Sequence, residues 1–101
     1  LAQLEAISQA PGTPAPYRDL ATLLAVQLQV DEGDIAALQS RLAPLKAEGT
    51  PWRYAARELS ALLSLRAGEV ESARATLEAL KADADAPAGV KDRAGKLLAT
   101  L

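Results

Sequence analysis

Residues 68–82 read GEVESARATLEALKA, and residues 33–47, which lie 35 positions earlier, read GDIAALQSRLAPLKA. Both stretches open with a glycine and an acidic residue, and both then place apolar side chains three or four positions apart. That spacing is the period of an amphipathic α-helix. A repeat of this length with helical content predicts a solenoid built from helix pairs.

The repeat extends upstream of both stretches. LAQLEA at 1–6 resembles LAPLKA at 42–47 and LEALKA at 77–82. Identical residues recur at the 35-residue offset as Arg18 and Arg53, Ala21 and Ala56, Leu28 and Leu63, and Gly33 and Gly68. Prolines recur at nearly the same offset, as Pro16, Pro51 and Pro87. We expect each proline at the first position of a helix, where its missing N–H costs nothing.

We therefore predict an all-α, antiparallel helix-pair solenoid of about five to six helices in a single domain. Its expected parts are the end of a preceding helix at 1–9, a first pair at 16–46 (helices 16–30 and 34–46), a second pair at 51–83 (helices 51–67 and 69–83), and a terminal capping helix at 87–101. Pro44 should shorten or kink the first pair's second helix. Gly33 and Gly68 should end helices as left-handed residues, and Asp34 and Thr50 are candidate N-caps.

Each expected helix carries an apolar face, and we expect these faces to supply the core. Their members, in chain order, are Leu20, Ala21, Leu24 and Leu28; Ile35, Leu38, Leu42 and Leu45; Trp52, Ala55, Ala56, Leu59, Leu62 and Leu63; Val70, Ala73, Leu77 and Leu80; and Val90, Ala94, Leu97, Leu98 and Leu101.

The composition excludes several classes of function. Alanine and leucine make up 41 of the 101 residues, and valine and isoleucine only 6, which favours helix over strand. Histidine and cysteine are absent, which excludes Ser-His-Asp and Cys-His catalysis, disulfides and ordinary zinc sites. The net charge is −2, the charges are well mixed, and no apolar run is long enough to span a bilayer. We therefore expect no catalytic residue, cofactor, metal, nucleic-acid partner or membrane contact.

The stretch from Gly68 to Leu77 resembles the tetratricopeptide repeat. That family places glycine and an acid at the turn, then an apolar residue, a small residue and a large apolar residue. The matching residues are Gly68, Glu69, Val70, Ala73 and Leu77, with Ala61 in the close-packing position of the preceding helix. In the earlier unit Gly33, Asp34, Ile35 and Leu42 match, but Leu38 stands where the family usually has alanine. The resemblance thus implies a degenerate first repeat whose two helices Leu38 pushes apart.

Residues 42–101 also resemble the C-terminal part of the periplasmic tetratricopeptide proteins that accompany the bacterial Sec translocon. The residues that carry this resemblance are Glu48, Gly49, Trp52, Leu62, Leu63, Gly68, Glu69, Ala73 and Arg74, with Thr50-Pro51 as an insertion. It implies an inner-membrane protein with one N-terminal anchor, whose repeat domain faces the periplasm and works with the translocon or a chaperone. The chain starts at Leu1 and has no methionine, so we interpret it as a fragment that such an anchor would precede.

In the tetratricopeptide family, partners bind in a concave groove lined by the first helix of each pair. The resemblance places there Leu20, Leu23, Gln27 and Val30, followed by Ala55, Glu58, Leu62 and Leu65. It implies a mostly apolar groove for a helix or an extended segment of a partner protein. The alternative is that these side chains only fill the core; it is favoured for Leu62, whereas Leu23, Gln27 and Glu58 stay open between groove and core. Because the face lacks the family's Lys, Arg and Asn, a carboxylate clamp is not expected.

Other prominent residues have a structural interpretation. Trp52, the only tryptophan, is expected to pack the turn between the pairs onto the neighbouring pair, as Tyr17 would in the unit before it. The acidic residues around Gly33 are expected to form a solvated turn rather than a cation site. Arg53 and Arg57 are expected to lie on a solvated face rather than to meet an acidic partner.

We interpret the chain as a protein–protein interaction module, the soluble part of an envelope protein that assists the Sec translocon or periplasmic folding factors. One alternative is a cytoplasmic scaffold or oligomerisation module, and another is a helical enzyme domain with a carboxylate-based site. The expected location is the periplasmic side of a bacterial inner membrane, and otherwise the cytoplasm. Leu1, Leu4 and Ile7 are expected to pack back on residues 17–28 or to meet another copy, which leaves a homo-oligomer open.

Overall fold

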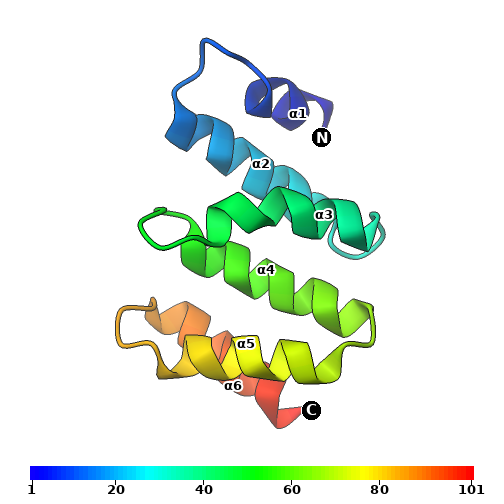
Figure 1. Ribbon diagram of the computed structural model, residues 1–101, viewed down its shortest axis with the longest axis vertical. Coiled ribbons are helices and arrows are strands. Elements are labelled where there is room, and N and C mark those ends of the chain that lie inside the picture. Colours follow the sequence, from blue (N-terminus) through cyan, green and yellow to red (C-terminus); the bar gives the residue numbers. More distant parts are fainter.

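The computed structural model describes residues 1–101 and contains six α-helices, one 3₁₀ helix and no strand. The helices are α1 (Ala2–Ser8), α2 (Ala15–Gln29), α3 (Ile35–Leu42), α4 (Arg53–Arg66), α5 (Val70–Ala82) and α6 (Ala88–Ala99), and η1 (Ala43–Lys46) continues α3 as a 3₁₀ helix. From α2 onward, consecutive helices run in alternating directions and stack along the longest axis of a molecule of 42 × 29 × 18 Å (Figure 1). The predicted all-α chain is confirmed, and every helix except α3 lies within about two residues of its predicted range; α3 ends four residues early and continues as η1.

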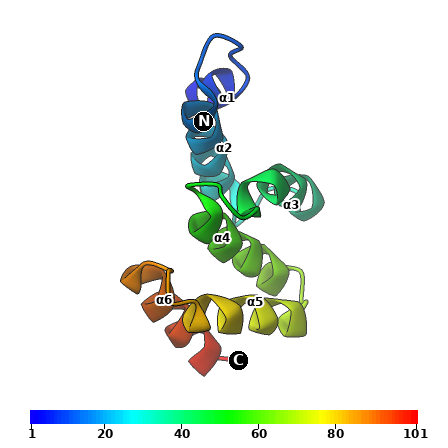
Figure 2. The same ribbon diagram turned by 60° about the vertical axis from the view of Figure 1, so that its left-hand side comes forward.

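The helices pack mainly against their neighbours in the chain. Seen from the side, α3 lies beside α2 and α4, α5 lies beneath α4, and α6 packs against α5 (Figure 2). The helix α1 packs against α2, and its Glu5 carboxylate forms a bidentate ion pair with Arg41 of α3, at 2.6 and 3.0 Å. Leu1 and Ile7 nevertheless stay about half exposed.

The core consists of two clusters that meet in α4. The first joins α2, α3, η1 and α4 through Leu23, Val26, Leu38, Leu42, Leu45, Ala56, Leu59 and Leu63. The second joins α4, α5 and α6 through Ala61, Leu77, Leu80, Val90 and Ala94. The apolar faces predicted for α3, α4 and α6 are therefore confirmed, and α4 links the two clusters.

The predicted apolar face of α2 is wrong for two leucines. Leu24 and Leu28 are 38% and 65% exposed, whereas Ala21, Ala25 and Val26 are fully buried. A four-residue step overshoots one helical turn by about 40°, so the row from Leu20 to Leu28 drifts away from the core. On α5, the first member of the predicted face, Val70, is also 39% exposed.

Three prolines stand at helix starts, but none is the first helical residue. Pro16 is the second residue of α2, Pro87 is the N-cap of α6, and Pro51 precedes Trp52, the N-cap of α4. The expected effect of Pro44 is confirmed, because α3 ends at Leu42 and the chain continues as η1. Proline has no N–H to donate to an α-helical partner.

Of the predicted caps, Asp34 and Gly68 are confirmed. The Asp34 carboxylate accepts the backbone N–H three residues on at 2.9 Å, and Gly68 has a φ of 80°. Gly33 is not left-handed. Thr50 is not an N-cap either, since its hydroxyl donates to the carbonyl oxygen of Leu45 at 2.6 Å and so closes the preceding turn.

Candidate functional site

A groove of about 650 Å³ lies between α2, α4 and α6. Its lining residues are Leu23, Gln27, Val30, Ala55, Glu58, Leu59, Leu62 and Arg93. A smaller hollow of about 310 Å³ continues it over α6, and its lining residues are Glu58, Leu62, Arg93, Lys96 and Leu97. The structure thus brings together most of the residues that the sequence placed in a groove. Leu20 and Leu65 are the exceptions, because both are half-buried but line neither hollow.

The lining residues occupy equivalent positions on the three helices. At the 35-residue offset they are Leu23, Glu58 and Arg93, and one helical turn further along they are Gln27, Leu62 and Leu97. Because α2, α4 and α6 run in the same direction, each presents the same part of its surface to the groove (Figure 1). The offset found in the sequence therefore reappears in the geometry of the site.

A bidentate ion pair joins α4 to α6 where the groove meets the smaller hollow. The Arg93 guanidinium donates from Nε to Glu58 Oε2 at 2.6 Å and from Nη2 to Glu58 Oε1 at 2.9 Å. These hydrogen bonds and the charge of Glu58 raise the pKa of Arg93 above its ordinary value. The Glu58 side chain is 13% exposed and that of Arg93 is 57% exposed. The Glu58 carboxylate therefore ties α6 to α4, and the positive charge of Arg93 lies at the surface.

The structure shows how leucines can belong to core and groove at once. Leu23 is 5% exposed and a member of the first core cluster, yet one side of it forms the groove floor. Leu62 is half-buried, packs against the same cluster and also lines the groove. Gln27 is exposed, and its side-chain amide makes no hydrogen bond within the chain. Gln27 is therefore the uncharged polar residue of the groove whose side chain is free to hydrogen-bond to a ligand.

The interpretation of Trp52 is confirmed. Its indole Nε1 donates to the carbonyl oxygen of Pro16 at 3.1 Å, and the ring packs against the first core cluster. The tryptophan thereby fastens the turn before α4 onto α2. Tyr17, expected to do the same in the preceding unit, is 64% exposed. Tyr17 is the third residue of α2, whereas Trp52 is the N-cap of α4. The two aromatic side chains therefore occupy different positions relative to the start of their helices.

The expectation of a solvated face at Arg53 and Arg57 is wrong. Their side chains are only 25% and 23% exposed, and both guanidinium groups face the Glu48 carboxylate, at 4.0 and 3.0 Å. They also lie over the ring of Tyr54, at 4.5 and 5.7 Å from its centroid. These contacts hold the loop between η1 and α4.

Comparison of the chain with protein-family models, curated proteins and solved structures finds no match. Across the chain, no group of three acidic side chains lies close enough to hold a metal ion. None of the helices combines the length and the apolar character that a membrane span requires. The candidate site is therefore defined by its geometry, as a largely apolar groove with an ion pair where it meets the smaller hollow.

Proposed function

We propose that this chain is a tetratricopeptide-type interaction module whose groove binds a segment of a partner protein. The observation that carries the proposal is the repeated register, in which equivalent positions of α2, α4 and α6 line one groove. A chain that presents the same helix surface three times in succession offers a continuous surface for an elongated ligand, as helical solenoids do.

The lining indicates the chemistry of the segment. Leu23, Leu59 and Leu62 form an apolar floor, which favours a partner that inserts aliphatic or aromatic side chains. The free amide of Gln27 can donate to a partner carbonyl and accept from a partner N–H. The segment is therefore an amphipathic helix or an extended strand with apolar side chains on one face.

The narrower setting is the periplasmic side of a bacterial inner membrane, with the Sec translocon or a folding factor as partner. This part of the proposal rests on the sequence resemblance of residues 42–101. A cytoplasmic scaffold with the same fold is the alternative, and the identity of the captured partner separates the two.

The test is site-specific photo-crosslinking in cells of the source organism. A photoreactive residue replaces Gln27 of α2, which lines the groove, or Lys96 of α6, which lines the hollow that continues it. Ser40, an exposed residue of α3 that lines neither, serves as the matched control. The groove positions should capture the same partner, and Ser40 should capture none of it. Equal capture from Ser40, or different partners from Gln27 and Lys96, would contradict the proposal.

A single substitution complements the crosslinking. Gln27→Lys places a charge above the apolar floor and should weaken partner binding about tenfold, because the ammonium group loses water without gaining an ion-pair partner. The melting temperature should stay unchanged, since Gln27 is exposed and makes no side-chain hydrogen bond. The control Ser40→Lys should bind the partner as the unmodified chain does.

A further inference from the structure

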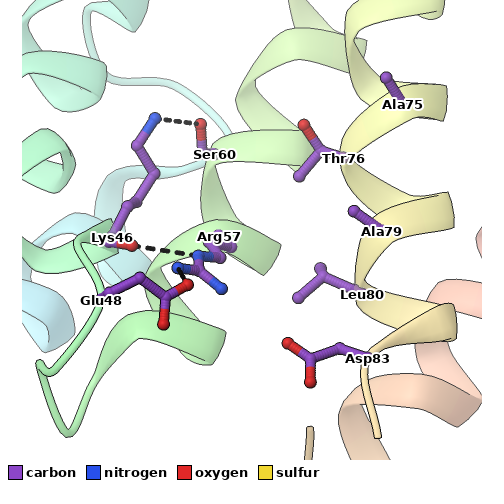
Figure 3. A pocket seen from close by; sticks show the side chains of 9 residues that line it. All are labelled: Lys46, Glu48, Arg57, Ser60, Ala75, Thr76, Ala79, Leu80 and Asp83. Carbon is purple, nitrogen blue, oxygen red and sulfur yellow. Dashed lines mark hydrogen bonds and ion pairs between the residues drawn. The ribbon is translucent and has the colours of Figure 1, made fainter. Parts of the chain in front are cut away.

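A second hollow lies on the face of α4 that points away from the groove. It has a volume of about 480 Å³ and separates the η1–α4 region from α5. Lys46, Glu48, Arg57 and Ser60 form one wall, and Ala75, Thr76, Ala79, Leu80 and Asp83 form the other (Figure 3). We refer to this hollow as the polar cleft.

A chain of hydrogen bonds fixes the first wall. The Lys46 ammonium donates to the hydroxyl oxygen of Ser60 at 3.3 Å (Figure 3). That hydroxyl donates to Gln39 Oε1 at 2.7 Å. Gln39 Nε2 in turn donates to the carbonyl oxygen of Ser60 at 3.0 Å. The Ser60 proton is therefore directed at an amide oxygen rather than at a base. Lys46 is held in place and keeps two of its three N–H donors for other partners.

The charges of the polar cleft do not all cancel within the chain. Arg57 is paired with Glu48 at 3.0 Å, and Glu48 also faces Arg53 at 4.0 Å. Lys46 and Asp83 have no oppositely charged group within 4.0 Å. These two lie on opposite walls, with the apolar side chains of Ala79 and Leu80 on the α5 wall between Thr76 and Asp83 (Figure 3). One positive and one negative charge, with Arg57 between them, therefore line the same hollow, whose α5 wall is partly apolar (Figure 3).

We propose that the polar cleft binds a zwitterionic ligand. Its carboxylate lies on the Lys46 ammonium, its ammonium or guanidinium group lies on the Asp83 carboxylate, and its aliphatic linker lies over Ala79 and Leu80. A ligand with both charges satisfies both walls and leaves no net charge in the cleft. This chemistry is found in free amino-carboxylates and in peptide segments that carry an acidic and a basic side chain. The site lies outside the groove and does not depend on the function proposed for it.

A length series of ω-aminocarboxylates tests the proposal. The ¹⁵N-labelled chain is titrated with glycine, 4-aminobutyrate, 6-aminohexanoate and 8-aminooctanoate, and the amide shifts of Ser60, Thr76 and Ala79 are followed by NMR. Saturable shifts with one preferred linker length are expected, weakening as salt is added. Hexanoate and hexylamine, which carry one charge each, should bind more weakly than the preferred member.

A peptide arm distinguishes the two sources of the ligand. The probe is a blocked Glu-Ala-Ala-Ala-Lys peptide, and its control is the blocked Gln-Ala-Ala-Ala-Gln peptide. Saturable binding of the charged peptide alone assigns the cleft to a protein segment, and binding of the short aminocarboxylates alone assigns it to a small molecule. Absence of saturable shifts from every zwitterionic probe would overturn the proposal.

Charge-neutral variants locate the binding. Lys46→Gln and Asp83→Asn should each weaken the preferred probe about fivefold, the effect of one partly exposed ion pair. Glutamine at 46 retains a donor for Ser60, and the melting temperature of each variant checks that the fold is kept. Lys91→Gln is the matched control, because Lys91 lines neither the polar cleft nor the groove, and it should bind as the unmodified chain does. Unchanged affinity in both cleft variants, or an equal loss in Lys91→Gln, would overturn the assignment.

Discussion

The helix pairs α2–α3 and α4–α5 follow one sequence pattern but pack differently. In the second pair α5 runs for 13 residues and packs extensively against α4; in the first, α3 ends after 8 residues and makes a smaller contact with α2. Equivalent buried positions hold Leu38 in the first pair and Ala73 in the second. A leucine at a helix contact keeps the two backbones further apart than an alanine does. Pro44 ends α3 early, and we attribute the smaller contact of the first pair to Leu38 as well.

The turns inside the two pairs are also stabilised differently. In the second pair, the N–H groups of Gly68 and Glu69 donate to carbonyl oxygens of the same helix at 3.0 and 2.8 Å, so the turn is complete by itself. In the first pair, the Gly33 N–H likewise donates to the Gln29 carbonyl oxygen at 2.7 Å, and the Arg66 guanidinium of α4 additionally donates to the carbonyl oxygens of Val30 and Gly33. The first turn therefore has a contact from the second pair that the second turn lacks, and the groove takes one wall from each.

The largest expected effect comes from matched truncations in the two core clusters. Leu42 and Leu77 occupy equivalent positions, and both are 0% exposed. Leu77→Ala should lower the free energy of unfolding by about 3 kcal/mol, and Leu42→Ala by less, because the looser first pair relaxes into the cavity. Urea unfolding followed by circular dichroism gives both values. A larger loss for Leu42→Ala would contradict the packing difference.

The next effect concerns the contact of Arg66 with the first turn. Arg66→Met should lower the free energy of unfolding by about 1.5 kcal/mol, because two carbonyl oxygens lose a charged donor. Arg74→Met is the control, since Arg74 makes only an ion pair with the exposed Glu71 at 3.5 Å, and it should cost less than about 0.5 kcal/mol. Equal costs for the two variants would show that the first turn does not need α4.

The two turn glycines should respond to different replacements. A Cβ on Gly33 would lie 2.9 Å from Leu38 Cδ1 and 3.0 Å from the Gln29 carbonyl oxygen, whereas Gly68 has open space but a φ of 80°. Alanine should cost about 1 kcal/mol at either site, and asparagine, which tolerates a left-handed backbone, should be accepted better than alanine only at Gly68. Thermal unfolding measures the difference. If Gly33→Asn were tolerated better than Gly33→Ala, steric contact would not be the reason for glycine at position 33.

The smallest expected effect on the free energy of unfolding concerns the N-caps of α3 and α5, the second helix of each pair. Asp34 caps α3 with its side chain, but Glu69 makes no side-chain cap for α5. Asp34→Ala should therefore cost about 0.7 kcal/mol, and Glu69→Ala close to zero. The same thermal unfolding experiment measures both. A loss of stability in Glu69→Ala with none in Asp34→Ala would contradict the assignment of Asp34 as the side-chain N-cap.

The helices and two of the caps could be predicted because their signals are local. Periodicity, proline and glycine mark helix ends within a few residues, and Asp34 and Gly68 act on their own turns. The exposure of Leu24 and Leu28 depends instead on which sides of α2 are covered by its neighbours. The burial of Arg57 depends on how the loop before α4 folds back. Neither arrangement is encoded in a single helical stretch.

The groove was predictable as far as the repeat could be aligned, and Arg93 shows the limit. Its partner Glu58 lies on another helix, so no local pattern joins them. The signal that could have found it is the same 35-residue offset, which relates Leu23, Glu58 and Arg93. Applying the offset once more, into the terminal helix, would have placed Arg93 in the groove.

Native-state hydrogen exchange of the whole chain, read residue by residue, tests the central claim most directly. That claim is a groove with one firm wall, from α4, α5 and α6, and one looser wall, from α2 and its partner α3. The amides in the middle of α2 and α3 should exchange at least about tenfold faster than those in the middle of α4 and α5. Equal protection in both pairs, or weaker protection in α4 and α5, would contradict it.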